Sequence, residues 1–452
     1  MASPRGSMSS MMTTAAHLRA FRDDVYACFT QRRDALFDLV DALLTAETVP
    51  SPVHLSLTPA HRRGWGSLYA ALAAGRIDVP ALRDLLARHP LADGQPIYAV
   101  DCSVWVRDDA ETSPERGFYY HPSRHSAGQP IVAGWAYQWL AQLSFTWDSW
   151  TAPLDVQWVH PTADANEVAI EQVQRLCQRL LTDGPVPLFV FDAGYDPVPL
   201  TLGLAETRAA LLVRLRSDRC VYADPTSQPR TGRPRRHGAK LVCADPATWP
   251  APSDEFCTDD RRYGRVRVRG WAGLHPKQQM HADRGTRKPR PVVRGTLVLV
   301  EVSRLPRPTR LPKQLWLWWA GPDTPDLDVL WRAYVHRFDV EHTLRFAKQT
   351  LLWTTPRLRH PEQADRWTWL VIIAYTSLRL AKDLVHDQRL PWERPRRPGR
   401  LTPYRVRRAV SALLINLGTP ANPPQPCGRS PGRPKGRRSG PAPRHPAIKK
   451  AA

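Results

Sequence analysis

The residues best suited to chemistry lie in the segment WRAYVHRFDVEHTLRFAKQT, residues 331–350. Tyr334, Arg337, Glu341 and Lys348 stand there at offsets of zero, three, seven and fourteen. On one continuous α-helix, at about 100° per residue, these positions fall within a sector of about 60°. A phenol, two cations and a carboxylate would then face one space, which suits a metal-bound phosphodiester. The simpler alternative is a solvated amphipathic helix in which Arg337 and Glu341 form an ordinary surface ion pair.

Two further carboxylates follow apolar runs that predict buried strands. Asp101 ends the run IYAVD, and Asp192 ends the run LFVFD. Taken singly, an Asp after a strand is more often a turn former or a helix N-cap. Together with Glu341 they would crowd three negative charges into one cleft, which cations must neutralise. We therefore expect Asp101, Asp192 and Glu341 to hold two Mg²⁺ ions, with Mn²⁺ as a substitute, because Mg²⁺ accepts oxygen ligands and leaves room for water and phosphate.

These motifs resemble those of DDE transposases of the insertion-sequence-four type, which have an RNase H-like catalytic core. The shared features are AVDCS around Asp101, DAGY from Asp192 to Tyr195, and the signature Y-x2-R-x3-E-x6-K. Tyr334, Arg337, Glu341 and Lys348 satisfy that signature without a gap. The resemblance covers about residues 95 to 385. In the family, a β-rich insertion accounts for the long separation between the second Asp and the Glu, which is 148 residues here.

The resemblance implies DNA cleavage at the ends of a mobile element, followed by strand transfer to target DNA, with a hairpin intermediate in some relatives. One metal ion would activate a water and later a DNA 3′-hydroxyl, and the other would stabilise the leaving oxygen. Tyr334, Arg337 and Lys348 would bind phosphates, Arg337 through its planar fork and Lys348 as a point charge. A homodimer is expected, because two DNA ends must be brought together. Two alternatives stay open: a catalytically inactive DNA-binding protein of the same fold, and a Mg²⁺-dependent nuclease without strand transfer.

The composition agrees with a nucleic-acid partner. The 452 residues carry 64 Lys plus Arg against 42 Asp plus Glu, a net charge of +22 that attracts a polyanion. An anionic membrane is the competing partner, but no run reaches about 18 apolar residues. The N-terminus lacks the apolar stretch of a secretory signal, and the seven cysteines include no C-x-x-C pair. We expect a bacterial cytoplasmic, nucleoid-associated protein without a disulfide framework or zinc ribbon.

The predicted fold class is α/β: an RNase H-like mixed sheet flanked by helices. Apolar runs predict an antiparallel meander of three strands after residue 95, then helices at about 166–182 and 198–209, each followed by a strand. The expected divisions are a flexible N-terminus at 1–16, a helical DNA-end-binding domain at 17–92, a first core part at 93–216, a basic β-rich insertion at 217–296, a second core part with the signature helix at 297–390, and a disordered Pro/Arg-rich basic tail at 391–452.

Other segments have two readings. Arg261 to Arg294 includes eleven Lys or Arg and one acid, Asp283, which predicts phosphate contacts or solvated loops. GRPRR at 232–236 and PGRPKGRR at 431–438 resemble minor-groove AT-hooks, or belong to non-specific basic arms.

Several aromatic and histidine residues also allow two interpretations. Trp316, Trp318 and Trp319 are either core residues or a surface on which a base stacks. His121 and His125 have a metal-compatible spacing, but without a partner nearby a polar loop is favoured.

Overall fold

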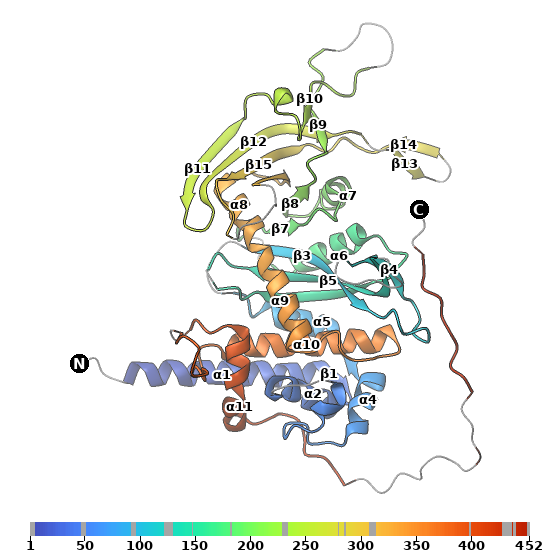
Figure 1. Cartoon of the computed structure of the whole chain (residues 1–452), viewed down its shortest axis with the longest axis vertical. Coiled ribbons are helices and arrows are strands. Elements are labelled where there is room, and N and C mark those ends of the chain that lie inside the picture. The colour runs from blue at the N-terminus through green and yellow to red at the C-terminus, as the bar shows by residue number, and fades with distance from the viewer. Residues whose placement is uncertain are drawn as a thin grey trace.

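The fold is built around one large mixed sheet with helices on both faces (Figure 1). The computed structural model describes residues 5–46, 51–91, 96–121, 130–146, 148–180, 183–227, 234–278, 280–283, 286–306, 313–396, 399–426, 436 and 440–449. The sheet has twelve strands, and its core follows the RNase H-like α/β order predicted from the sequence. Within the described residues, no helix is both long and apolar enough to cross a membrane.

The core strands begin as an antiparallel meander and end as a parallel set. The elements, in chain order, are β3 (Ile97–Val106), β4 (Gly117–Tyr120), β5 (Ile131–Leu143), β6 (Ala152–Val159), α6 (Ala165–Cys177), β7 (Leu188–Phe191), α7 (Pro197–Gly203) and β8 (Ala210–Leu215). β5 pairs antiparallel with β3, β4 and β6, whereas β7 runs parallel to both β3 and β8. Each crossover passes through a helix, as parallel strands require. Asp164 and Asp196 cap α6 and α7 by accepting backbone N–H groups, which fixes where each helix starts.

The insertion continues the same sheet. Its elements are β9 (Cys220–Tyr222), β10 (Lys240–Val242), the 3₁₀ turn η1 (Pro246–Thr248), β11 (Asp254–Asp260), β12 (Gly264–Pro276), β13 (Met280–Asp283) and β14 (Thr286–Pro289). β15 (Gly295–Val302) and β16 (Gln314–Ala320) follow and lead into the second core part. β16 pairs with β8, β15 with β16, and β12 with β15, while β13 and β14 form a separate hairpin. In β12, Val266 and Val268 are buried and the intervening arginines point outward, the alternation expected of a strand with one covered face.

A buried helix joins the sheet to the N-terminal helices. The N-terminal elements are α1 (Arg5–Cys28), β1 (Phe29–Gln31), α2 (Arg33–Thr45), α3 (Pro52–Leu55), α4 (Trp65–Ala74), β2 (Arg76–Ile77) and α5 (Val79–Ala87). Helix α10 (Pro361–Ala381) packs against β6 on one side and against α1, α2 and α4 on the other. It contains the run WTWLVIIAY, every residue of which is buried, as expected of a helix segment covered on all sides. Arg83 of α5 also donates to Asp155 of β6 at 2.7 Å.

Several boundaries differ from the sequence predictions. The helix predicted to reach residue 182 ends at Cys177, and the one predicted to reach 209 ends at Gly203. The signature segment forms two helices, α8 (Leu327–His336) and α9 (Phe338–Gln349), not one. Strand β4 was not predicted.

The tail is not disordered throughout, contrary to the prediction. It contains α11 (Pro403–Leu417), whose Val406, Val410 and Leu414 recur every four residues and are buried. Near the C-terminus, Ile448 N donates to Arg116 O at 2.6 Å beside β4. The tail motif at 431–438 lies outside the described residues except Gly436, and only 234–236 of GRPRR are described. His125 also lies outside them.

Candidate active site

The register of two parallel strands brings Asp101 and Asp192 together. β3 pairs with β7 through Ile97–Val100 and Leu188–Phe191, with Val100 opposite Phe191. Asp101 directly follows Val100, and Asp192 directly follows Phe191. Because neighbouring strands lie about 4.8 Å apart, the two carboxylates leave the paired region on adjacent strands at the same level. The two carboxylates therefore lie where the pairing of β3 with β7 ends.

The turn after β7 holds the second carboxylate. Gly194 N donates to Asp192 Oδ1 at 2.8 Å. At the next residue, the Tyr195 hydroxyl hydrogen-bonds the Gln138 side-chain amide at 2.9 Å, inside the protein. The DAGY segment is thus tied to β5 as well as to its own strand, so the Asp192 side chain has a defined position.

Helix α9 supplies the third carboxylate. It packs on β3 and β5, on the sheet face to which Asp101 points, since Asp101 is the register partner of Trp139 and that ring contacts Trp353 below α9. Arg337, at the start of α9, donates from Nη2 to Glu341 Oε1 at 2.9 Å, and its Nη1 lies 3.7 Å from Asp101 Oδ2. Arg337 is only 3% exposed. One buried guanidinium therefore links Glu341 to Asp101.

The electrostatics show that the three acids share one environment. Burial raises the pKa of Asp101 to about 7; Arg337 opposes that rise, and the charges of Asp192 and Glu341 add to it. Burial lowers the pKa of Lys348, while the charge of Asp101 opposes the change. The charges of Arg337, Asp192, Glu341 and Lys348 therefore interact with that of Asp101. Three of the six predicted site residues, Asp101, Glu341 and Lys348, line one cleft.

This cleft is an open cavity of about 320 Å³. It is lined by Asp101, Cys102, Ser103, Glu341, Leu344, Arg345, Lys348 and Gln349. The sequence analysis missed Cys102, Ser103, Arg345 and Gln349. Arg345 and Gln349 follow Glu341 by four and eight residues, so the helical period could have found them.

The carboxylates suit a hard divalent cation in chemistry, because Mg²⁺ prefers anionic oxygen ligands. Their charges already attract a cation, the Arg337 guanidinium, which lies between Asp101 and Glu341. However, in the part of the chain that the structure describes, no three His, Cys, Asp or Glu side chains gather closely enough to hold a metal ion. Asp101, Asp192 and Glu341 thus fit Mg²⁺ as oxygen donors, but the three carboxylates do not gather in this arrangement, in which Arg337 pairs with Glu341.

Tyr334 is the sixth predicted site residue, and it faces the interior. It is 2% exposed, and among the described residues its hydroxyl has no hydrogen-bond partner. The angular prediction assumed one continuous helix, whereas α8 ends where α9 begins, at Arg337. The two helices rest on different supports, α8 on β11 and β12 and α9 on β3 and β5. Tyr334 on α8 does not line the cleft with Glu341 and Lys348, although its ring lies 5.7 Å from the Arg337 guanidinium.

The basic segment of the insertion has acidic neighbours that its own stretch of sequence does not contain. Arg267 of β12 donates to Glu255 of β11 at 2.8 Å, and Arg269 donates to Glu301 of β15 at 2.7 Å. Strand pairing thus neutralises part of the row of arginines that was predicted to contact phosphates.

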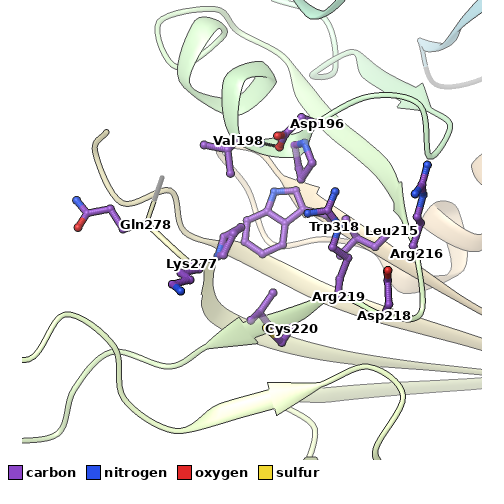
Figure 2. A pocket seen from close by; sticks show the side chains of 13 residues that line it. Asp196, Val198, Leu215, Arg216, Asp218, Arg219, Cys220, Lys277, Gln278 and Trp318 are labelled. Atoms are coloured by element: carbon purple, nitrogen blue, oxygen red, sulfur yellow. Dashed lines mark hydrogen bonds between the residues drawn. The ribbon is translucent and has the colours of Figure 1, made fainter. Parts of the chain in front are cut away.

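A second, larger pocket of about 480 Å³ lies where the core meets the insertion (Figure 2). The Trp318 indole lies among its lining side chains, between Val198 of α7 and Cys220 of β9 (Figure 2). Register partners share a sheet face, so Trp318 lies with Val213, Phe191 and Val100 on the face opposite Asp101. The pocket contains none of the predicted catalytic residues.

The three tryptophans of β16 are core residues. Trp316, Trp318 and Trp319 are 3%, 0% and 8% exposed. Trp316 packs against Trp249 and Trp271, with ring centroids 5.1 and 5.7 Å apart. Of the two readings of this cluster, the structure supports the core.

Comparison with known proteins identifies a family. Residues 24–277, more than half of the chain, match the family model described as DDE superfamily endonuclease. No curated protein matches the chain. The match includes Asp101 and Asp192 and ends before Glu341. It implies a nuclease that acts on DNA, and nucleases of this superfamily typically use divalent metals. The chain belongs to the DDE superfamily endonuclease family.

Proposed function

We propose that the protein is a DNA transposase of the insertion-sequence-four type. It would cut DNA at the ends of a mobile element and join those ends to target DNA. The observation that carries the proposal is the link between Arg337, Asp101 and Glu341, because it ties two members of the Y-x2-R-x3-E-x6-K signature to the first strand carboxylate. A solvated surface helix would not bury its arginine against a strand of the sheet.

Each site residue has a role in this proposal. Asp101, Asp192 and Glu341 would hold the Mg²⁺ ions, which when bound supply a Lewis acid for in-line phosphoryl transfer. Lys348, half-buried in the cleft, would attract the scissile phosphate as a point charge. Arg337 would contact a phosphate through its fork once it leaves Glu341. Tyr334 would hydrogen-bond a neighbouring phosphate only after its ring turns outward from the core.

The remaining parts of the chain would serve DNA assembly. The net charge of +22 supports binding to the transposon ends and to the target. We assign DNA-end binding to the helical region at 17–92 and further phosphate contacts to the insertion at 217–296. A homodimer in the synaptic complex would bring two ends together, and the bacterial cytoplasm, at the nucleoid, is the compartment in which these substrates occur.

The test is Mg²⁺-dependent cleavage of DNA that carries the element ends. Asp101→Asn, Asp192→Asn and Glu341→Gln are each expected to abolish cleavage and leave DNA binding within about twofold, since each removes a charge but little volume. Asp339→Asn is the matched control on α9, because Asp339 pairs with His336 at 2.9 Å and not with the cleft. Full activity in any of the three variants would remove that residue from the site.

A nuclease without strand transfer is the second candidate, and the family description as an endonuclease favours it equally. The two functions differ in their products. Incubating precut element ends with target plasmid yields joined DNA only if strand transfer occurs. Cleavage of the ends with no joined product would establish the nuclease.

A further inference from the structure

The charge balance of the cleft points to a role for Arg337 that precedes DNA binding. We propose that Arg337 is a resident counter-ion: it holds Asp101 and Glu341 together in the metal-free protein and competes with the divalent cation for them. This inference rests on the proposed metal site. It makes Arg337 a positioning residue that acts through the carboxylates.

The contacts of Arg337 are those of a counter-ion. Its Nη2 is 2.9 Å from Glu341 Oε1, its Nη1 is 3.7 Å from Asp101 Oδ2, and the residue is 3% exposed. Burial disfavours its charge, yet Asp101 and Glu341 raise its pKa overall. Without this cation, the buried Asp101 would face two like charges with only Lys348 left to compensate them.

The guanidinium is also incompletely bonded where it is. Among the described residues, its Nε and Nη1 have no hydrogen-bond partner that meets normal geometry, although both are buried. Buried N–H groups without partners are costly, so the present position is not the best one available to this side chain when a phosphate is at hand. The arginine is held by the two carboxylates and by the rings of Tyr334 and Phe338, 5.7 and 5.1 Å from its guanidinium carbon. Another cation can replace its charge at the carboxylates.

The junction between α8 and α9 is the point at which Arg337 can shift relative to Glu341. Arg337 stands between α8 and α9, and Val340 N donates to Arg337 O at 3.1 Å, a three-residue bond that replaces the usual four-residue one. Helix α8 rests on the insertion strands and α9 on the core strands. A small displacement of one support relative to the other would thus move Arg337 with respect to Glu341.

The experiment counts free Mn²⁺ by its electron paramagnetic resonance signal during titration of the full chain, without DNA. Arg337→Gln is expected to bind Mn²⁺ about fivefold more tightly than wild type, because a competing, partly screened charge is gone. Arg345→Gln is the matched control: Arg345 is exposed, lines the same cleft and loses the same charge. Its effect is expected to stay under about twofold, from screened long-range charge alone.

The outcomes of the titration separate a failure of the counter-ion role from a failure of the metal site. Unchanged or weaker Mn²⁺ binding by Arg337→Gln, or equal tightening by Arg345→Gln, overturns the counter-ion role. If wild type binds no Mn²⁺, or Asp101→Asn binds it normally, the metal site itself is wrong, which is a different failure. Should Arg337→Gln not fold, as judged by circular dichroism, a crystal structure of wild type with Mn²⁺ decides: Nη2 must move beyond about 4 Å from Glu341 Oε1, and a retained contact refutes the proposal.

Discussion

The backbone N–H of Gly194 binds the Asp192 carboxylate, and the same carboxylate occupies the space where a side chain at position 194 would begin. Gly194 N donates to Asp192 Oδ1 at 2.8 Å, and a Cβ placed on Gly194 would lie 3.0 Å from the same oxygen. A side chain two residues after Asp192 would therefore press on its carboxylate, so glycine at this position protects the carboxylate geometry.

Gly194→Ala is expected to lower the rate of DNA cleavage about tenfold and to leave DNA binding unchanged. The added methyl group displaces the Asp192 carboxylate by a few tenths of an ångström, and small misplacements of reacting groups are costly. The measurement is the single-turnover cleavage rate at saturating DNA. Gly66→Ala on α4 is the control, because a Cβ there meets nothing within 4 Å. A Gly194→Ala rate equal to wild type would show that the carboxylate tolerates the shift.

The raised pKa of Asp101 makes the stability of the metal-free protein depend on pH. The pKa is about 7 in the folded chain, against an ordinary value of 3.8. Between these values the folded state binds more protons than the unfolded state, so the free energy of unfolding falls as pH rises from about 4 to 7.

Asp101→Asn removes this dependence and is expected to stabilise the protein at pH 8 by on the order of 2 kcal/mol. At pH 3 the difference from wild type should vanish, because Asp101 is then largely protonated in both states. Urea unfolding in EDTA at the two pH values measures it. A variant less stable than wild type at pH 8 would mean that the contact with Arg337 outweighs burial.

The strand carboxylates could be predicted from the sequence because their signal is local. Asp101 and Asp192 each end an apolar run, and the structure has β3 through Asp101 and β7 up to the residue before Asp192. Their pairing required only that the two strands be parallel neighbours, which the RNase H-like order provides. The same local logic located α6, α7 and β8.

The orientation of the two halves of the signature segment depends on tertiary contacts that the local sequence pattern does not encode. The helical period assigned Tyr334 and Glu341 to one face, but it carries no information on what each half of the segment rests against. Since α8 lies on insertion strands and α9 on core strands, Tyr334 is buried beside Arg337 and does not line the cleft. The acidic partners of Arg267 and Arg269 were missed for a related reason, because they lie on neighbouring strands outside the basic stretch.

A buried ion pair fixes α1 against α2, and its removal tests how the N-terminal helices are held. Arg22 donates to both carboxylate oxygens of Asp41, at 2.7 and 3.1 Å, with both side chains buried. Arg22→Met would leave Asp41 buried without a partner and is expected to destabilise the protein by about 3 kcal/mol. Chemical unfolding followed by tryptophan fluorescence measures the change.

The exposed pair of Arg88 and Asp24, 3.5 Å apart, is the matched control. Arg88→Met should change stability by less than about 0.5 kcal/mol, because solvent screens this pair. The double variant Arg22→Met with Asp41→Leu should recover most of the loss. If it is no more stable than the single variant, the arginine acts through its bond to Gly418 O and not through Asp41.

The ion pair between Arg267 and Glu255 provides a test of whether the insertion binds DNA. If β12 contacts DNA, Glu255 competes with phosphate for Arg267, to which it is joined at 2.8 Å. Glu255→Gln is then expected to raise affinity for DNA two- to threefold at about 50 mM salt, with a smaller gain at 200 mM, because the freed cation adds to counter-ion release. Fluorescence anisotropy of labelled duplex DNA at the two salt concentrations measures it. Glu206→Gln, which removes an exposed acid beyond α7, controls for net charge. Equal gains in both variants would mean that total charge, and not this strand, meets the DNA.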